Sequence, residues 1–370
     1  MRILISAGGT GGGVYPALSV VEALNEHYPE VEAIFVGSVK GFERDLVYSS
    51  QVRLTGYHEV QSGPLHGVSI VQVCVSLVRL LIGFIQSLVL ISRLRPNALF
   101  ITGGWVTFPI TLAAWVLRVP ILVFVPDIEP GLAIQVLQPF CQQVATATER
   151  SRPYVSPSKM VVTGYPVRKG IAQATRDQAM TRFHLDPTRK TLLVFGGSRG
   201  ARSINSAVLA FLPQLLADGL QVIHLSGTLD YEAVRASLPV LSTPEHYHLF
   251  PYLHEEQMGM ALAGADLVVS RAGASILGEF PIFRLPAILI PYPHAWRYQK
   301  VNADYLSAQG AAVILTDQDM SEHLYPMIHD LIGDAPRLAQ MAVAMQQAGY
   351  SNGSARLATQ LMKLAGERQQ

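Results

Sequence analysis

The chain has 370 residues, which is long for one typical domain and enough for two, each with its own core. Its 28 basic and 27 acidic residues give a formal net charge of +1, which disfavours nucleic acid as a partner. Cys74 and Cys141 offer no disulfide framework or metal-ligand spacing, and they fit a reducing compartment. Only 15% of residues are charged and 49% are hydrophobic, so we expect part of the surface to meet a membrane or a lipid.

The amino-terminal residues run straight into a glycine-rich stretch, with no room for a signal peptide, and this favours a cytoplasmic protein. Residues 3–5 form a short apolar run that is typical of a strand covered on both faces. Residues 8–13 are almost all glycine, and residues 17–27 have a helical pattern with Pro16 in the first turn. The spacing is not GxGxxG, so this stretch alone is weak evidence for a nucleotide. A second strand is predicted over residues 32–36.

The longest apolar stretch covers residues 68–91. On a helix its interruptions form one narrow stripe, because they step by three and four residues: Ser69, Gln72, Ser76, Arg79, Gly83 and Gln86. Three interpretations are open, namely a packed crossover helix, a helix whose apolar face lies at the bilayer interface, and a spanning helix. Arg79 near the centre makes the spanning helix costly.

Two carboxylates follow a predicted strand over residues 120–125. Asp127 and Glu129 are the only acidic side chains at that strand end. Either is a candidate general base, although loop carboxylates are more often turn formers or helix caps. Further strands of this half are predicted over residues 98–101, 144–146 and 159–162.

The pattern of the first residues restarts at Thr191. A strand over residues 192–195 runs into a second glycine-rich stretch, residues 196–201, and a helix begins near Ser203. A second strand and glycine loop about half a chain after the first predict two Rossmann-like domains. Asp317 and Asp319 superficially match a metal-binding DxD pair, but their position before a helical pattern favours helix capping.

Residues 270–302 have the pattern of a phosphate-binding unit, because a buried strand turns through Gly273 into a helix. Glu279 lies about one and a half turns into that helix, where its carboxylate would reach a ribose. The next strand, over residues 285–291, is followed by polar side chains at the edge where doubly wound sheets bind ligands, namely His294, Arg297, Gln299 and Asn302. The alternative is an ordinary βαβ unit with polar caps.

Four segments together resemble the MurG family of glycosyltransferases, and the resemblance spans nearly the whole chain. They are GGTGGGVYP at residues 8–16, GGSRGA at 196–201 with Asn205, SRAGASILGE at 270–279 and HAWRYQKVNA at 294–303. The resemblance implies an α/β GT-B fold, with two Rossmann-like doubly wound domains facing each other across a cleft. Residues 1–164 would form the acceptor and membrane-facing domain, residues 165–345 the UDP-sugar domain, and residues 346–370 a helix that crosses back.

The resemblance also implies inverting transfer of N-acetylglucosamine from its UDP donor to the lipid-linked muramyl-pentapeptide. The implied partners are UDP-N-acetylglucosamine, a polyprenyl-diphosphate-linked acceptor and the inner face of the cytoplasmic membrane, on which the protein would be peripheral. No metal or other cofactor is expected, because a helix dipole and backbone donors stabilise the charge growing on the leaving UDP.

Site residues carry over from the family residue by residue. Leu253 would lie against uracil, Glu279 would bind the ribose, and Gln299 and Asn302 would line the sugar end. Other donor contacts are assigned to Ala274 and, for the diphosphate, to Arg168, Gly197, Ser198, Arg199, Gly200 and Ala201. The acceptor diphosphate is assigned to Thr10, Gly11, Gly12 and Gly13. Asp127 and Glu129 are the catalytic candidates.

Three positions depart from the family pattern. Gly13 stands where most members have a histidine, Asp127 where they usually have asparagine, and Tyr298 where glutamine is common. The donor half therefore matches well and the acceptor half does not. Two alternatives follow: a paralogue that uses a UDP-sugar on another lipid acceptor, and a non-catalytic partner that binds a nucleotide sugar or a membrane. An NAD-dependent oxidoreductase is weakened because Glu32 lies at the start of its strand, away from the ribose position.

Overall fold

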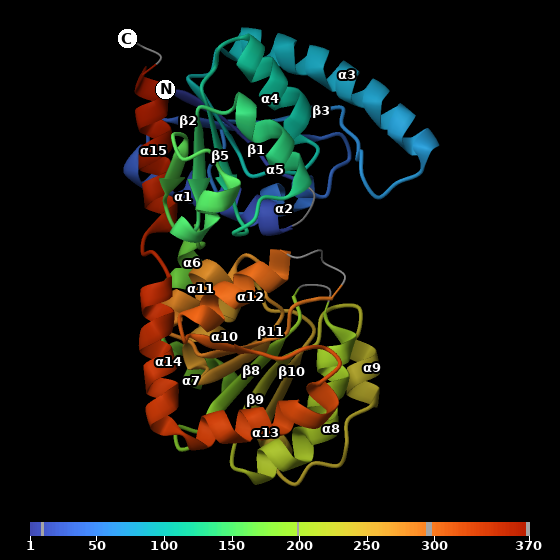
Figure 1. The fold of residues 1–370 in the computed structure, drawn as a ribbon, viewed down its shortest axis with the longest axis vertical. Coiled ribbons are helices and arrows are strands. Elements are labelled where there is room, and N and C mark those ends of the chain that lie inside the picture. The colour runs from blue at the N-terminus through green and yellow to red at the C-terminus, as the bar shows by residue number, and fades with distance from the viewer. Residues whose placement is uncertain (9–10, 198–199, 294–297, 368–370) are drawn as a thin grey trace. The chain divides into compact units, whose positions relative to one another are not determined.

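The computed structural model describes residues 1–8, 11–197, 200–293 and 298–367 (Figure 1). The chain divides into two compact units, one made of Met1–Arg168 with Tyr350–Gln370 and the other of Lys169–Gly349. Each unit is built around one parallel sheet with helices on both faces, so the prediction of two doubly wound α/β domains is confirmed.

The first unit has a seven-stranded sheet in the order β3-β2-β1-β4-β5-β6-β7. Its strands are β1 (Arg2–Ser6), β2 (Glu32–Ser38), β3 (Gly56–Val60), β4 (Ala98–Ile101), β5 (Ile121–Val125), β6 (Gln143–Thr146) and β7 (Met160–Val162). All residues of β4 and β5 and residues 3–6 of β1 are buried, because helices cover both faces, and this explains their unbroken apolar runs. The edge strand β3 is not among the predicted strands, since most of its residues are only half-buried.

Helices of the first unit differ from prediction mainly at their starts. They are α1 (Gly11–His27), α2 (Glu43–Ser49), α3 (Ile70–Leu94), α4 (Thr107–Val116), α5 (Leu132–Leu137) and α15 (Gly353–Glu367), with short 3₁₀ turns η1 (Gln138–Phe140) and η2 (Glu149–Tyr154). The helix expected over residues 17–27 already begins at Gly11, so Pro16 lies inside it and not in its first turn. The carboxy-terminal helix α15 packs against α1 within this unit.

The second unit has a six-stranded sheet in the order β10-β9-β8-β11-β12-β13, which is the 3-2-1-4-5-6 order of a Rossmann fold. Its strands are β8 (Thr191–Phe195), β9 (Gln221–Leu225), β10 (Tyr247–Phe250), β11 (Leu267–Ser270), β12 (Ala287–Leu289) and β13 (Ala312–Ile314). Its helices are α6 (Lys169–Ala172), α7 (Arg176–Phe183), α8 (Arg202–Ala217), α9 (Tyr231–Ala236), α10 (Glu255–Gly264), α11 (Ile276–Phe283), α12 (Tyr298–Ala308), α13 (Met320–Gly333) and α14 (Ala335–Ala348), with the 3₁₀ turn η3 (Pro244–His246).

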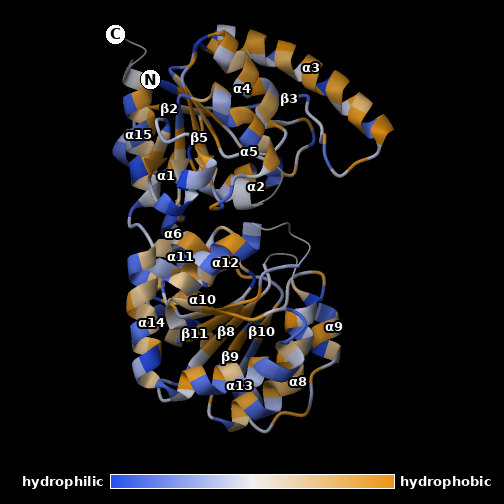
Figure 2. Ribbon diagram, viewed as in Figure 1, coloured by the Kyte–Doolittle hydropathy of each residue, from blue (hydrophilic) through white to orange (hydrophobic). Residues whose placement is uncertain are grey.

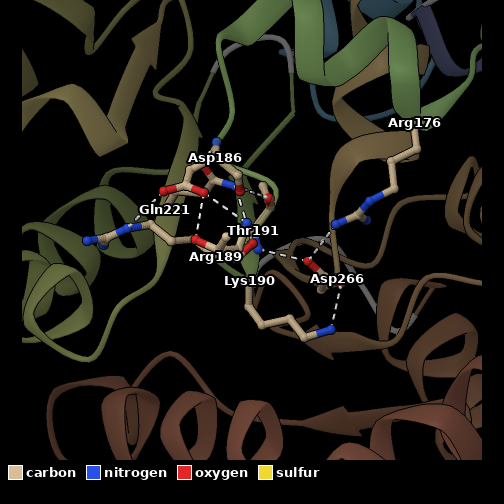
Figure 3. Close-up of polar contacts among 8 residues, drawn as sticks. Arg176, Asp186, Arg189, Lys190, Thr191, Gln221 and Asp266 are labelled. Atoms are coloured by element: carbon tan, nitrogen blue, oxygen red, sulfur yellow. Dashed lines mark hydrogen bonds and ion pairs between the residues drawn. The ribbon is translucent and has the colours of Figure 1, made fainter.

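A polar cluster links strands at the amino-terminal edge of the second sheet (Figure 3). The Asp266 carboxylate, just before β11, accepts from the backbone N–H of Thr191 at 2.9 Å, and it pairs with Lys190 at 3.1 Å and with Arg176 of α7 at 3.2 Å. Gln221, the first residue of β9, donates to the Thr191 hydroxyl at 2.9 Å. The cluster therefore joins three strands and one helix at the edge away from the glycine loop.

The helix α3 is apolar along most of its length (Figure 2), and its buried side combines three small residues with Leu80 and Ile91. Ser76, Gly83 and Ser87 are buried, and a Cβ on Gly83 would lie 1.9 Å from the Gln61 carbonyl oxygen. The same Cβ would lie 3.2 Å from Cγ of Pro109 in α4, on which this side of α3 packs. The other side exposes large apolar side chains, namely Ile70, Val71, Val75, Leu77, Val78, Leu81, Ile82, Ile85 and Val89.

Candidate functional site

Both glycine-rich stretches lie where the strand order of a sheet reverses. The first follows β1, between β2 and β4, and the second follows β8, between β9 and β11. In open parallel sheets, the carboxyl edge at such a reversal is the ligand-binding position. The topology therefore supplies one candidate site in each unit.

In the first unit, the residues around the β1 glycines are in close contact with the loop after β4. The Thr102 hydroxyl donates to the Gly13 carbonyl at 2.8 Å, and a Cβ on Gly104 would lie 2.5 Å from the Gly8 carbonyl oxygen. Gly104 has φ +87°, which a side chain would strain. Gly11, Gly12 and Gly13 form the first turn of α1, so their N–H groups lie at its positive end.

Gly13 leaves little room for the histidine of the family pattern. A Cβ there would lie 3.3 Å from the Gly8 carbonyl oxygen and 3.4 Å from the Thr102 hydroxyl, so these neighbours would have to shift by a few tenths of an ångström. Gly13 itself is buried, whereas Gly12 is exposed. The tight packing at this position is consistent with glycine in this chain.

The two carboxylates after β5 differ in exposure. Asp127 is half-buried, whereas Glu129 is only 3% exposed, and both precede α5 at the carboxyl edge of the sheet. A general base needs access to the proton that it removes, so Asp127 is the better placed of the two.

Arg168 belongs to the first unit, although the family pattern assigns it to the donor diphosphate. Its guanidinium carbon lies 4.0 Å from the ring centroid of Tyr15, which is in the first half of α1. This cation–π contact holds the guanidinium beside the helix that follows the first glycine stretch.

In the second unit, the glycine loop before α8 adopts backbone angles that favour glycine. Gly197 has φ +99° and Gly200 has φ +86°, and the Gly200 N–H donates to the Gly197 carbonyl at 2.9 Å. Ala201 precedes α8 and has no side chain that could cap it. Ala201 therefore does not cap the N–H groups in the first turn of this 16-residue helix. Such N–H groups are the ones that bind phosphate at a helix start.

A buried arginine joins the loops around this site. Arg271, directly after β11, forms a two-pronged salt bridge with Asp317 at 2.8 and 3.2 Å. The same guanidinium donates to the Ser203 hydroxyl of α8 at 2.9 Å and to the Ile290 carbonyl at 3.1 Å. Asp317 therefore holds Arg271. Asp319 directly precedes α13 but makes no side-chain capping hydrogen bond, so the prediction of helix capping was wrong for both side chains. The sequence motif SRAGA contains Arg271, but its pairing with Asp317 depends on tertiary structure.

The remaining donor candidates lie along the same carboxyl edge. Leu253 follows β10 and is 3% exposed, whereas Glu279 lies in α11 and is half-buried. Ala274 is in the turn between β11 and α11. At the start of α12, the Gln299 side chain accepts from the Tyr292 N–H at 2.8 Å, and Asn302 is fully buried and donates to the Ala272 carbonyl at 3.1 Å. Both amides thus fix the loops that border the site.

Some predicted residues lie outside the described part of the chain, namely Thr10, Ser198, Arg199, His294 and Arg297. Within residues 1–8, 11–197, 200–293 and 298–367, no cluster of three or more His, Cys, Asp or Glu side chains could hold a metal ion. The two candidate sites are thus made of glycine loops, helix starts and single polar side chains.

Comparison with known proteins identifies the family. Residues 3–146 match the model described as Glycosyltransferase family 28 N-terminal domain, and residues 191–357 match the C-terminal domain model. A protein of Roseiflexus sp. (strain RS-1), named UDP-N-acetylglucosamine--N-acetylmuramyl-(pentapeptide) pyrophosphoryl-undecaprenol N-acetylglucosamine transferase, is 35% identical over 100% of this chain and 96% of its own. The chain belongs to the MurG family. A MurG relative with the same name from Desulforamulus reducens is 36% identical over 94% of this chain and 95% of its own.

Solved structures agree with the MurG fold. The crystal structure of Acinetobacter baumannii MurG has a TM-score of 0.76 at 23% identity, and the match covers 98% of this chain and 99% of that chain. A UDP-GlcNAc 2-epimerase from Neisseria meningitidis, bound to UDP-GlcNAc, has a TM-score of 0.69 at 15% identity and coverage of 98% and 100%. These likenesses confirm the fold class expected from the sequence.

Proposed function

We propose that this chain transfers N-acetylglucosamine from UDP-N-acetylglucosamine to the lipid-linked N-acetylmuramyl-pentapeptide, with inversion at the sugar carbon. The observation that carries the proposal is the full-length relationship to proteins named for this transfer, at 35% and 36% identity. The two glycine-rich stretches at the strand-order reversals supply a place for each of two diphosphate substrates.

The donor binds in the second unit in this proposal. The start of α8, which the side chain of Ala201 does not cap, and the backbone of Gly197, Gly200 and Ala201 face the UDP diphosphate, and Glu279 binds the ribose. As the acceptor hydroxyl attacks the anomeric carbon, the bond from that carbon to the diphosphate oxygen breaks and UDP leaves. Backbone N–H groups and the helix dipole stabilise the negative charge that develops on UDP.

The acceptor binds in the first unit, with its diphosphate at Gly11, Gly12 and Gly13 in the first turn of α1. Asp127 removes the proton from the attacking hydroxyl, because it is the more exposed of the two carboxylates after β5. Glu129, which is 3% exposed, shapes the loop. Arg168 adds positive charge beside α1.

Turnover in this proposal needs no metal ion, because backbone donors and a helix dipole supply the charge stabilisation that a metal would provide. The corresponding measurement is turnover with and without EDTA. Activity that is lost with EDTA and restored by Mg²⁺ or Mn²⁺ would contradict this part of the proposal.

The protein is peripheral on the inner face of the cell membrane in this proposal, and the exposed face of α3 is the contact. By length and composition α3 could cross a membrane, but its small-residue stripe packs on α4, which leaves only the outer face for lipid. Trp115 and Val116, at the end of α4, are further apolar side chains in this unit that are each 51% exposed. The acceptor carries a polyprenyl tail, so this contact would bring the site to its substrate.

The function is tested by incubating the purified protein with UDP-N-acetylglucosamine and the lipid-linked muramyl-pentapeptide, and then identifying the extracted lipid by mass spectrometry. The expected product is larger than the acceptor by one N-acetylglucosamine residue. A lipid of unchanged mass, from protein that binds UDP, would contradict the proposed acceptor.

A second candidate is transfer of the same sugar to a different polyprenyl-linked acceptor. Gly13 and Asp127 favour it, since both depart from the family pattern on the acceptor side. A panel of polyprenyl-diphosphate sugars in the same assay separates the two candidates.

A further inference from the structure

A buried histidine lies behind the donor loop. His224, in β9, has no exposed surface. Its Nε2 lies 3.0 Å from Asn205 Oδ1 of α8, and its Nδ1 lies 2.8 Å from the Tyr247 hydroxyl of β10. Other buried residues on this face of the sheet are aliphatic, for example Val222, so a histidine with both nitrogens bonded needs an explanation.

The hydrogen bonds determine which nitrogen of His224 carries the proton. Asn205 Nδ2 donates to the Ser226 carbonyl at 2.9 Å and lies 3.5 Å from the Asp230 carboxylate. Both of these partners can only accept, so Asn205 must direct its oxygen toward the histidine. The Nε2 of His224 therefore donates, and its Nδ1 accepts from the Tyr247 hydroxyl. Burial lowers the pKa of His224 to about 4, so the ring is neutral at physiological pH.

Asn205 connects this histidine to the donor loop. Its backbone N–H donates to the Ala201 carbonyl at 2.9 Å, and its side chain holds the Ser226 carbonyl. That carbonyl lies directly against the loop, because a Cβ on Gly200 would come within 2.2 Å of it. A displaced Asn205 side chain would release Ser226 and change the surface on which Gly200 rests.

The hydrogen-bond network continues from Asn205 through Asp230 to the surface. Asp230 is 7% exposed, and its Oδ1 accepts from Arg202 Nε at 3.3 Å and Nη2 at 3.2 Å. Arg202 is the first residue of α8, where a positive charge opposes the helix dipole. Asp230 offsets that cost and fixes the direction of the guanidinium beside the donor loop. The network thus runs from Tyr247 in β10 to an exposed cation next to the proposed diphosphate site.

We propose that His224 is a positioning residue for the UDP-sugar diphosphate, acting through Asn205 on the Ser226 carbonyl and on the Gly197–Ala201 backbone. His224 touches no substrate. The inference rests on the proposed function, because it takes the loop before α8 as the diphosphate site.

The test measures UDP affinity by calorimetry in four single variants and one double variant. His224→Leu removes the donor to Asn205, His224→Gln keeps an N–H near the position of Nε2, and Asn205→Ala removes the link. Val222→Ala is the matched control, since it makes a cavity on the same face of β9 but removes no hydrogen-bonding group. The double variant of His224→Leu with Asn205→Ala completes a cycle that tests whether His224 acts through Asn205.

We expect His224→Leu to raise the Kd for UDP by about tenfold or more, and His224→Gln to stay within about threefold of wild type. In the Asn205→Ala background, His224→Leu should change the Kd by less than about twofold. In turnover assays, the KM for the UDP-sugar should rise and the KM for the lipid acceptor should not.

Three results would overturn the inference. One is a UDP affinity of His224→Leu equal to that of Val222→Ala. Another is an equal loss of affinity in His224→Leu and His224→Gln, and the third is a full effect of His224→Leu in the Asn205→Ala background. If His224→Leu does not fold, Asn205→Ala decides: it should raise the Kd for UDP about tenfold, and a Kd equal to that of Val222→Ala would overturn the inference. A wild-type protein that binds no UDP would refute the proposed function instead, so the two failures are distinguishable.

Discussion

Replacing two exposed leucines of α3 by glutamate should detach the protein from lipid vesicles. Leu77 and Leu81 are 53% and 62% exposed and lie one helical turn apart on the outer face. Glutamate is a good helix former, and neither leucine is buried in the core, so folding should be retained. The double variant therefore changes the surface and leaves the candidate sites intact.

The size of the effect follows from the exposed area. Full burial of a leucine side chain is worth about 1.5–3 kcal/mol, so the exposed half or more of each leucine contributes about 1–2 kcal/mol on entering lipid. The two together contribute about 3 kcal/mol, which corresponds to a loss of about 100-fold in vesicle partitioning. The charge of the new glutamates adds to this loss, since carboxylates resist transfer to an apolar medium.

A native cysteine provides the assay. Cys74 is exposed on α3, whereas Cys141 is buried and burial raises the pKa of its thiol to about 12, so an environment-sensitive fluorophore should attach at Cys74. Addition of vesicles should shift the emission of labelled wild-type protein to shorter wavelength. Val240→Glu is the matched control, because Val240 is 97% exposed and lies in the second unit. UDP affinity should be the same in all three proteins.

Two outcomes would refute the reasoning. Equal vesicle binding by the double variant and the wild type would show that α3 is not the contact. A Cys74 label that stays in a polar environment while the protein co-sediments with vesicles would place the contact elsewhere.

Four further predictions concern single residues. Glu279→Ala should raise the Kd for UDP about tenfold with an unchanged melting temperature, and an unchanged Kd in calorimetry would remove the ribose assignment. Asp127→Asn should lower kcat by about 10²-fold or more with little change in donor affinity, and full steady-state activity would leave Asp127 a structural role. The pKa of His224 is about 4 in the folded protein and 6.5 in the unfolded chain. The neutral ring should therefore contribute about 3 kcal/mol to the free energy of unfolding above pH 6.5, and this contribution should be lost as the pH falls to 4. Urea titrations between these pH values should show that the free energy of unfolding falls less steeply with acid in His224→Gln than in wild type. Burial also lowers the pKa of His248 in both proteins, so only the difference between the two slopes reports on His224. Identical slopes would contradict the assignment. Asp266→Ala should cost about 1–3 kcal/mol of unfolding free energy, since it leaves the Thr191 N–H and two cations without their carboxylate, and a melting curve like that of wild type would argue against the cluster.

Local pattern predicted most of the fold. The runs at residues 3–5 and 192–195 are continuous because both faces of each sheet are covered, and each leads into glycines that a strand or helix interior would disfavour. Once the strands are placed, the carboxyl-edge rule alone locates the candidate sites. The family resemblance assigns the acceptor to the first of these sites and the UDP-sugar to the second.

Features that depend on tertiary contacts could not be predicted in this way. The stripe on α3 steps at helical spacing, but whether Ser76 and Gly83 face inward depends on how closely Gln61 and α4 approach. Asp317 has the sequence position of a helix cap, and its actual partner, Arg271, is 46 residues away in the sequence. His224 lies in an apolar strand with no local signal for the Asn205 contact. In each case the deciding partner is distant in sequence.

The most direct test of the central claim is the release of UDP from UDP-N-acetylglucosamine by the purified protein, measured with and without the lipid-linked muramyl-pentapeptide. The account predicts that release depends on the acceptor, and that the chain turns over with Gly13 in place of the family histidine. UDP binding without acceptor-dependent release would contradict the proposed transfer.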